Sequence, residues 1–517
     1  MLAPIVKIGA VASLASTVMA LVPNITNDIG NGVHVPGAIP ANLDEPLQHH
    51  LAFAGPNGMT VSWASFNQIQ TPTVWYGTDP ANLDVKASSN QSATYPTSRT
   101  YDNHVALTGL KPGTKYYYKV SYTNTPAAAY RPIYSFTTSR AAGDKTPFTM
   151  SVFADLGLMG PDGLSTITGP ANQADAFTEL GSSDTNTIQS LLELKDSYEF
   201  MHHAGDIAYA DYAIKEAIQG LLGTDNAPTI PTREETAETY ESLLEQFFDQ
   251  IQPVTAEKTW MVSPGNHEAD CDDGSATNKV AHISYNDTFC VEGQKNFTFY
   301  SHHYRMPSAQ SKGVENFWYS YDYGMAHFIS LNTETDLGAN LTAPSDVPGD
   351  INGPFGYPNQ QIEFLVNDLR RVDRKKTPWV VVFLHRPWYT STSPPIWPAW
   401  QQAFEKIFYD YGVDIYLTGH VHNYERFTPM FNGTIDPNGL NNPRAPWPIL
   451  NGAAGHYDGL DLFDAGPRAN GSVFSTDQTY GWGRLNFIDA EHLTYEFVAS
   501  RNSTVVDSAT LYKKRNN

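Results

Sequence analysis

The sequence predicts an α/β sandwich flanked by helices and preceded by a small all-β sandwich. Three observations lead to this fold class. The chain has 517 residues, which is too long for a single hydrophobic core. Residues 48–138 contain short alternating segments separated by turns, a pattern typical of β-sandwiches. From residue 148 onward, strand-like and helix-like segments alternate, a pattern typical of α/β domains.

The all-β domain is expected at residues 47–140, after an irregular arm at 21–46 that is rich in Pro, Gly and Asn. Residues 107–118 resemble the corner of a fibronectin type III domain. No titratable constellation occurs in this region, so we expect it to be structural or to provide an accessory contact surface. The expected strands include 59–63, 73–76, 104–107 and 115–120.

The α/β domain is expected at residues 141–517. Apolar residues at helical spacing predict helices, and short β-rich apolar runs predict strands. The expected helices are 187–197, 234–252, 360–371 and 400–411. The expected strands are 148–154, 200–204, 259–262, 380–384 and 415–417, with a hairpin formed by 318–323 and 325–332 and further short strands over the last ~60 residues.

The N-terminus has the pattern of a secretory signal. Lys7 is followed by a short apolar run that ends in small residues near Ala20, so residues 1–20 are expected to be removed. No later stretch contains the roughly 18–20 uncharged apolar residues of a membrane helix. We therefore expect a secreted, extracellular protein with no membrane partner.

Two further patterns agree with secretion. The two cysteines, Cys271 and Cys290, are expected to form one disulfide, because an oxidising compartment favours pairing and two lone cysteines lack the spacing of a zinc site. Eight Asn-x-Ser/Thr sequons are candidate glycosylation sites. They lie at Asn24, Asn90, Asn286, Asn296, Asn340, Asn432, Asn470 and Asn502.

The charge balance excludes one class of partner and sets a condition on another. The formal net charge is −22, from 32 Lys+Arg and 54 Asp+Glu. Such a surface argues against nucleic acid as a partner, because phosphate backbones require a basic footprint. It would also repel phosphate esters, so any phosphate site needs local positive charge, which bound metal cations would supply.

A binuclear metal site is predicted from five short clusters of polar residues. They lie at residues 155–157, 205–209, 265–268, 385 and 419–422. Each follows a strand-like apolar run, and their side chains offer carboxylate, phenol, amide or imidazole donors, which suit iron, zinc or manganese. A lone buried histidine is usually a core residue, but the position of His385 between other clusters favours a ligand. Paired cations about 3.5–4 Å apart clamp both oxygens of a phosphoryl transfer. The candidate ligands are Asp155, Asp206, Tyr209, Asn266, His385, His420 and His422.

The order Asp-x-Gly, Gly-Asp-x-x-Tyr, Gly-Asn-His-Glu, His, Gly-His-x-His resembles the metallophosphoesterase superfamily, and within it the purple acid phosphatases of the large plant and fungal type. The resemblance covers roughly residues 145–500 and implies a metallophosphoesterase-type β-sandwich fold. Many relatives carry histidine at the position of Gly157, and Tyr209 replaces that donor here. Tyrosinate favours ferric iron, and the family's purple colour is attributed to it.

The resemblance also implies how the ligands divide and how the enzyme works. One group would hold Fe(III) and the other a divalent metal (Zn, Fe or Mn), with Asp206 bridging them. A metal-bound hydroxide would hydrolyse phosphate monoesters, and His267 would orient phosphate or protonate the leaving oxygen. The Fe(III) ligands would be Asp155, Tyr209 and His422, and the divalent ligands Asn266, His385 and His420.

One departure from the family pattern concerns substrate contacts. Plant-type members carry two histidines at the positions of Pro394 and Pro395. His456 and Arg386 are candidate replacements as substrate-binding residues. We therefore expect a secreted acid phosphatase for small phosphate esters, as a monomer or a non-covalent homodimer. The alternatives are a phytase, a phosphodiesterase or nucleotidase with the same site, or a non-catalytic extracellular binding protein.

Overall fold

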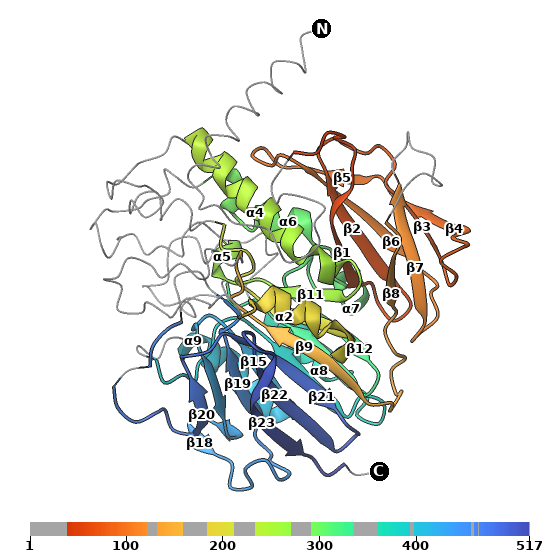
Figure 1. Ribbon diagram of the computed structural model, residues 1–517. Helices are drawn as coiled ribbons and strands as arrows, with labels where there is room; N and C mark the ends of the chain where they lie inside the picture. Colours follow the sequence, from red (N-terminus) through yellow and green to blue (C-terminus); the bar gives the residue numbers. More distant parts are fainter. Residues whose placement is uncertain are drawn as a thin grey trace.

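The computed structural model describes residues 39–121, 132–158, 184–210, 233–269, 291–334, 359–392, 398–455, 460–463 and 465–515. Within these ranges it confirms the predicted fold class, an α/β sandwich preceded by an all-β region (Figure 1). Several predicted features lie outside the described residues. They are the signal segment, the arm up to residue 38, Cys271, Cys290, Pro394, Pro395, His456 and the sequons at Asn24, Asn286 and Asn340.

The N-terminal region forms two facing layers of antiparallel strands. One layer has the order β4-β3-β7-β8, and the other contains β1, β2, β6 and β5. Large apolar side chains such as Trp63 and Tyr118 are buried in this region. The strands are β1 (Leu47–Phe53), β2 (Met59–Ser65), β3 (Thr73–Gly77), β4 (Val85–Ser88), β5 (Gln91–Ala93), β6 (Tyr101–Leu107), β7 (Lys115–Ser121) and β8 (Tyr134–Thr137).

The second of these layers continues into the α/β region. It belongs to a ten-stranded sheet with the order β23-β22-β21-β9-β10-β11-β1-β2-β6-β5, in which β1 pairs parallel to β11 through Leu51 and Thr259. The two predicted domains therefore share one sheet. The further strands are β9 (Phe148–Phe153), β10 (Phe200–Ala204), β11 (Thr259–Ser263), β21 (Gly481–Phe487), β22 (His492–Ala499) and β23 (Thr504–Tyr512).

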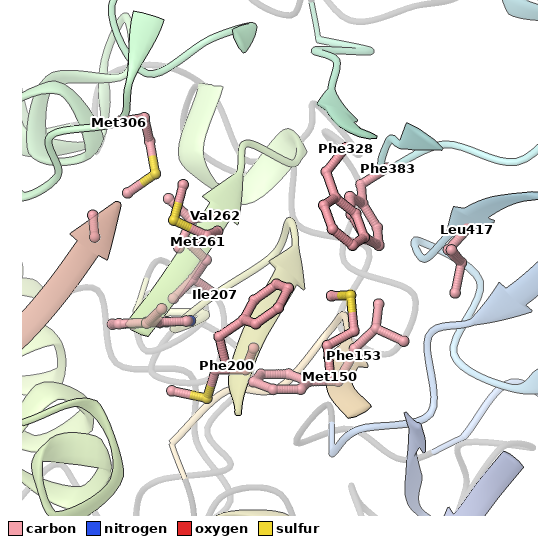
Figure 2. Packing of buried hydrophobic residues seen from close by; sticks show 14 of the residues in the cluster. Met150, Phe153, Phe200, Ile207, Met261, Val262, Met306, Phe328, Phe383 and Leu417 are labelled. Carbon is pink, nitrogen blue, oxygen red and sulfur yellow. The ribbon is translucent and has the colours of Figure 1, made fainter. Parts of the chain in front are cut away.

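A second, seven-stranded sheet has the order β12-β13-β14-β15-β19-β16-β20. Buried rings fill the space between the two sheets (Figure 2). Phe200 of β10 packs edge-on against Phe328 of β13, with ring centroids 5.6 Å apart. The strands are β12 (Tyr319–Tyr323), β13 (Ala326–Ser330), β14 (Trp379–Phe383), β15 (Ile415–Thr418), β16 (Tyr424–Phe427), β19 (Trp447–Asn451) and β20 (Ser472–Thr476), with a separate hairpin of β17 (Met430–Phe431) and β18 (Thr434–Ile435).

The predicted helices are present with two changes. The helix expected at 187–197 is α2 (Thr187–Glu193), which Asn186 caps, followed by a 3-10 turn, η3 (Lys195–Ser197). The one expected at 400–411 is a short α9 (Pro398–Trp400), a π-helical segment η5 (Gln401–Glu405) and α10 (Lys406–Tyr411). The other helical segments are α4 (Arg233–Thr255), α5 (Asn266–Ala269), η4 (Glu292–Gln294), α6 (Thr298–His303), α7 (Ser308–Ser311) and α8 (Gln360–Leu369).

The strand directions bring the five polar clusters to one end of the sandwich. β9, β10 and β11 are parallel, and so are β13, β14, β15 and β19. Asp155, Asp206 and Asn266 follow the carboxyl ends of the first group, and His385 and His420 follow those of the second. Open α/β sheets place their sites at this edge.

Two surface features of the described residues concern glycan sites and membrane helices. All five sequon asparagines in the described ranges, Asn90, Asn296, Asn432, Asn470 and Asn502, are exposed, as glycan attachment requires. Within the same ranges, no helix is both long enough and apolar enough to cross a bilayer.

Candidate metal centre

The first group of donors surrounds the hydroxyl of Tyr209. This oxygen lies 2.8 Å from Asp155 Oδ1, 3.1 Å from Asp206 Oδ2 and 3.0 Å from His422 Nε2. The two carboxylates and the tyrosine are almost fully buried, with exposures of 0%, 1% and 3%. Four donor atoms from three clusters thus meet at one point.

The second group lies directly beside the first. His385 Nε2 is 2.9 Å from Asp206 Oδ2 and 3.1 Å from Asn266 Oδ1, and His420 Nδ1 is 2.8 Å from the same Asn266 oxygen. Asp206 Oδ2 therefore belongs to both groups. The seven side chains singled out in the sequence are brought together as two sets that share one carboxylate.

The spacing of these atoms suits metal cations. Two donors held about 2.0–2.2 Å from one cation at right angles lie about 2.8–3.1 Å apart. The six separations given above fall in this range, and His422 Nε2 lies 3.5 Å from Asp155 Oδ1. A single phenol proton cannot serve both carboxylates at once, whereas a cation at the centre of the Tyr209 group would be bound by both of them and by the imidazole.

The electrostatics of the centre favour a positive charge. Burial alone would lower the pKa of His385, but Asp206 and Asp155 outweigh it and raise that pKa to about 9. Burial raises the pKa of Asp155. For Asp206, burial is outweighed mainly by the charge of His385, and its pKa is held well below the usual range. Because Nδ1 of His385 donates to the carbonyl of Ala204 at 2.9 Å, Nε2 is the nitrogen that faces the other donors.

Local backbone strain marks the same residues. Asp155, Asp206, Tyr209 and His420 have φ angles of +61°, +52°, +51° and +70°, which non-glycine residues seldom adopt. Such conformations cost on the order of 1–3 kcal/mol each and cluster at functional sites. Hydrogen bonds hold them in place. For example, the N–H of His420 donates to Asp155 Oδ2 at 2.8 Å.

Glycines allow the clusters to approach each other closely. A Cβ on Gly265 would lie 2.2 Å from Asp206 Oδ1, and one on Gly419 would lie 2.4 Å from Asp155 Oδ2. Both distances are far inside van der Waals contact. These two glycines are therefore required by packing against a carboxylate of a different cluster.

His267 lies at the edge of the centre. Its Nε2 is 3.9 Å from Asp206 Oδ2, and its ring packs against that of Tyr209 with centroids 4.4 Å apart. Its backbone N–H donates to Asp206 Oδ1 at 3.0 Å. A side chain in this position is close enough to contact a substrate held by the two donor groups.

The other candidate substrate residues are placed differently. Arg386 is only 3% exposed, and its Nε lies 2.8 and 2.7 Å from the two carboxylate oxygens of Glu334. Its guanidinium is thus engaged in a buried ion pair beside the centre. His456 lies outside the described residues.

Three acidic residues support the centre, and the sequence patterns did not predict a role for them. Glu334 holds Arg386, and Asp461 accepts the backbone N–H of His422 at 2.8 Å. Glu268 accepts hydrogen bonds from the backbone N–H groups of Asp206 and Gly265, in the turns that carry Asp206 and Asn266. The one available signal was that Glu268 lies two residues after the candidate ligand Asn266 in the same cluster.

Family models cover most of the chain. Residues 152–424 match the model of the calcineurin-like phosphoesterases. Residues 46–138 match the model described as the purple acid phosphatase N-terminal domain, and residues 445–508 match that of an iron/zinc purple acid phosphatase-like protein C-terminal domain. These models belong to enzymes that use a binuclear metal site.

Proteins that are similar to this chain over most of its length are named as acid phosphatases. The chain is 38% identical over 498 residues to acid phosphatase A of Cryphonectria parasitica, covering 92% of this chain and 93% of the relative. It is 30% identical to an acid phosphatase of Aspergillus ficuum, covering 89% and 85% of the two chains. It is 27% identical to purple acid phosphatase 21 of Arabidopsis thaliana, covering 91% and 85%.

A solved structure shows the same fold. Purple acid phosphatase PPD1 from yellow lupin (Lupinus luteus) superposes with a TM-score of 0.66 at 23% identity, covering 92% of this chain and 75% of the lupin chain. The matched family models, the nearly full-length relatives and the convergence of the seven donors agree. This chain belongs to the purple acid phosphatases, enzymes of the metallophosphoesterase superfamily that hydrolyse phosphate esters.

Proposed function

We propose that this chain is a secreted acid phosphatase that hydrolyses phosphate monoesters at an Fe(III)–divalent metal site. One observation carries the proposal: the Tyr209 hydroxyl lies within 3.1 Å of two carboxylates and an imidazole, beside a second donor group. A phenolate donor favours a hard trivalent ion. A second group with amide and imidazole donors suits Zn, Fe or Mn in the divalent state.

The proposed ligand sets follow the two groups. Asp206 would bridge the two ions, because its Oδ2 lies within 3.1 Å of donors from both groups. When bound, two such cations lower the pKa of a coordinated water and neutralise charge on the phosphoryl group. The Fe(III) ion would be held by Asp155, Tyr209 and His422, and the divalent ion by Asn266, His385 and His420.

The protein itself supplies positioning and a proton. His267 would orient the phosphoryl group or donate a proton to the leaving oxygen, because its ring packs against that of Tyr209 and its Nε2 lies 3.9 Å from Asp206 Oδ2. Asn266 and the histidines would keep their geometry through the backbone contacts already present, such as that between His385 and Ala204. Substrate contact by Arg386 or His456 remains a prediction.

Diesters, nucleotides and phytate are the second candidate substrate class. This class is retained because Pro394 and Pro395 stand where plant-type relatives carry two histidines, so the contacts beyond the metals differ from those of the relatives. A change at this position alters the groups available to contact a phosphate ester beyond the metals. The same centre would serve either class.

Secretion, glycosylation, a disulfide between Cys271 and Cys290, and a monomeric or non-covalent dimeric state belong to the same proposal. The signal-like N-terminus and the exposure of the five described sequon asparagines support the first two. Secretion into culture medium, a mobility shift after endoglycosidase treatment, thiol counting and light scattering would test these four properties separately.

The decisive experiment combines metal analysis with kinetics on the purified full-length protein. We expect one iron and one divalent metal per chain, a visible charge-transfer band, and faster hydrolysis of p-nitrophenyl phosphate than of its bis ester or of phytate. Faster hydrolysis of the bis ester or phytate would replace the monoester assignment with the second class. Protein with neither metal nor band would refute the metal site.

A further inference from the structure

Glu268 joins two turns that carry ligands. Its side chain is buried, with 1% exposure. Oε2 accepts the backbone N–H groups of Gly265 and Asp206, each at 2.8 Å, and Oε1 accepts that of Ile207 at 2.8 Å. One carboxylate therefore connects the turn after β11 with the turn after β10. These turns are about 60 residues apart along the chain.

The contact with Asp206 compensates a strained conformation. Asp206 has a φ of +52°, and its N–H and that of Ile207 both point at the Glu268 carboxylate. Successive N–H groups in such a turn form a cradle for an anion. Without the carboxylate, these two buried donors would lose their hydrogen-bond partners, which is unfavourable for the turn.

The turn after β11 also donates a hydrogen bond to the turn after β10. The N–H of His267 donates to Asp206 Oδ1 at 3.0 Å. With Oδ1 used in this way, Oδ2 is the oxygen that faces Tyr209 at 3.1 Å and His385 at 2.9 Å. The pair of reciprocal contacts therefore decides which Asp206 oxygen is shared between the two donor groups.

A purely structural role is the alternative, and the chain offers a matched example. Asp436 also accepts three backbone N–H groups, from Asn438, Arg444 and Ala445 at 3.0, 2.8 and 3.0 Å. Asp436 follows the β17–β18 hairpin and contacts none of the donor residues through these bonds. All three donors to Glu268, in contrast, belong to ligand-bearing turns.

We propose that Glu268 is a positioning residue that sets the orientation of Asp206 between the two metals. The inference rests on the metal site of the proposed function. It assigns Glu268 an effect on metal retention and on kcat, and little effect on KM, because Glu268 is buried behind the turns that carry the donors.

The test compares Glu268→Gln, Glu268→Asp and the control Asp436→Asn in the full-length protein. Glutamine keeps one acceptor oxygen but turns an N–H₂ group towards a backbone N–H. We expect Glu268→Gln to lower kcat and metal affinity at least about tenfold and to shift the visible band, with KM within about threefold. Glu268→Asp should recover part of the loss because it keeps the carboxylate. Asp436→Asn should lower only the melting temperature.

Two outcomes would overturn the inference. One is a Glu268→Gln protein with the wild-type metal content, band and kcat. The other is a set of variants in which activity simply follows melting temperature, with Asp436→Asn affected as much as Glu268→Gln. If Glu268→Gln does not fold, Glu268→Asp decides: a native circular dichroism spectrum with unchanged kcat and metal affinity also overturns it. A wild-type protein without metal would instead refute the proposed function and remove the basis of this inference.

Discussion

Replacing Tyr209 with phenylalanine tests the centre most directly. The change removes one oxygen atom, which lies 2.8–3.1 Å from three other donors. The ring is retained, so its packing against His267, with centroids 4.4 Å apart, is preserved. The perturbation is therefore confined to one of the four donor atoms around the proposed ferric ion.

The expected loss is large in activity and small in stability. Removing groups that only orient a metal ligand costs 10–100-fold, so loss of a donor itself should reduce kcat/KM at least about 100-fold, or about 2.7 kcal/mol in transition-state stabilisation. The visible charge-transfer band should disappear. The melting temperatures of the metal-free proteins should differ by less than about 3 °C, because loss of one buried hydroxyl costs about 1–3 kcal/mol, which is small against the unfolding entropy of a chain of this length.

A matched control is Tyr198→Phe. Tyr198 is equally buried, and its hydroxyl donates to the carbonyl of Leu191 at 2.8 Å. We expect this variant to lose about 1–3 kcal/mol of stability, because a buried carbonyl loses its partner, while metal content and kcat stay at wild-type values. If Tyr209→Phe keeps the band and the activity of the wild type, Tyr209 is not a metal ligand and the assignment of the ferric site is wrong.

Two further predictions concern packing and pH. Gly265→Ala should lower metal affinity at least about tenfold in a metal titration, because its Cβ would lie 2.2 Å from Asp206 Oδ1; wild-type affinity would contradict the geometry. His327 is buried, which alone would lower its pKa, but Asp322 and Asp368 at 2.6 and 2.7 Å outweigh burial and raise it to about 9. Because folding raises the pKa of His327 from 6.5 to about 9, the ion pair contributes its full stabilisation below about pH 6.5. This stabilisation is lost as the pH rises through about 9. The difference in unfolding free energy between wild type and His327→Gln should therefore shrink between pH 6 and 9.5 in denaturant titrations, and a constant difference would contradict the ion pair.

Much of the fold could be predicted because it depends on local patterns. Periodic apolar residues predicted β9, β10, β11, β14 and β15 to within one or two residues. The division of the helix expected at 400–411 into three segments was not predicted, because the π-helical segment has no distinct apolar periodicity in the sequence. The continuity of the ten-stranded sheet through β1 and β11 was not predicted, since strand pairing depends on which edges meet in space.

The sequence by itself determined the donor types, their order, and their positions after apolar strands, because these properties are local to each cluster. Only the tertiary structure decided that Asp206 Oδ2 faces both donor groups, that Arg386 is paired with Glu334, and that Glu268 connects two turns. The contacts of Arg386 with Glu334 and of Glu268 with Asp206 join residues 52 and 62 positions apart, and His385 reaches Asp206 from the end of a strand in the other sheet. No local pattern specifies them, because the packing of two sheets sets the distance between their ends.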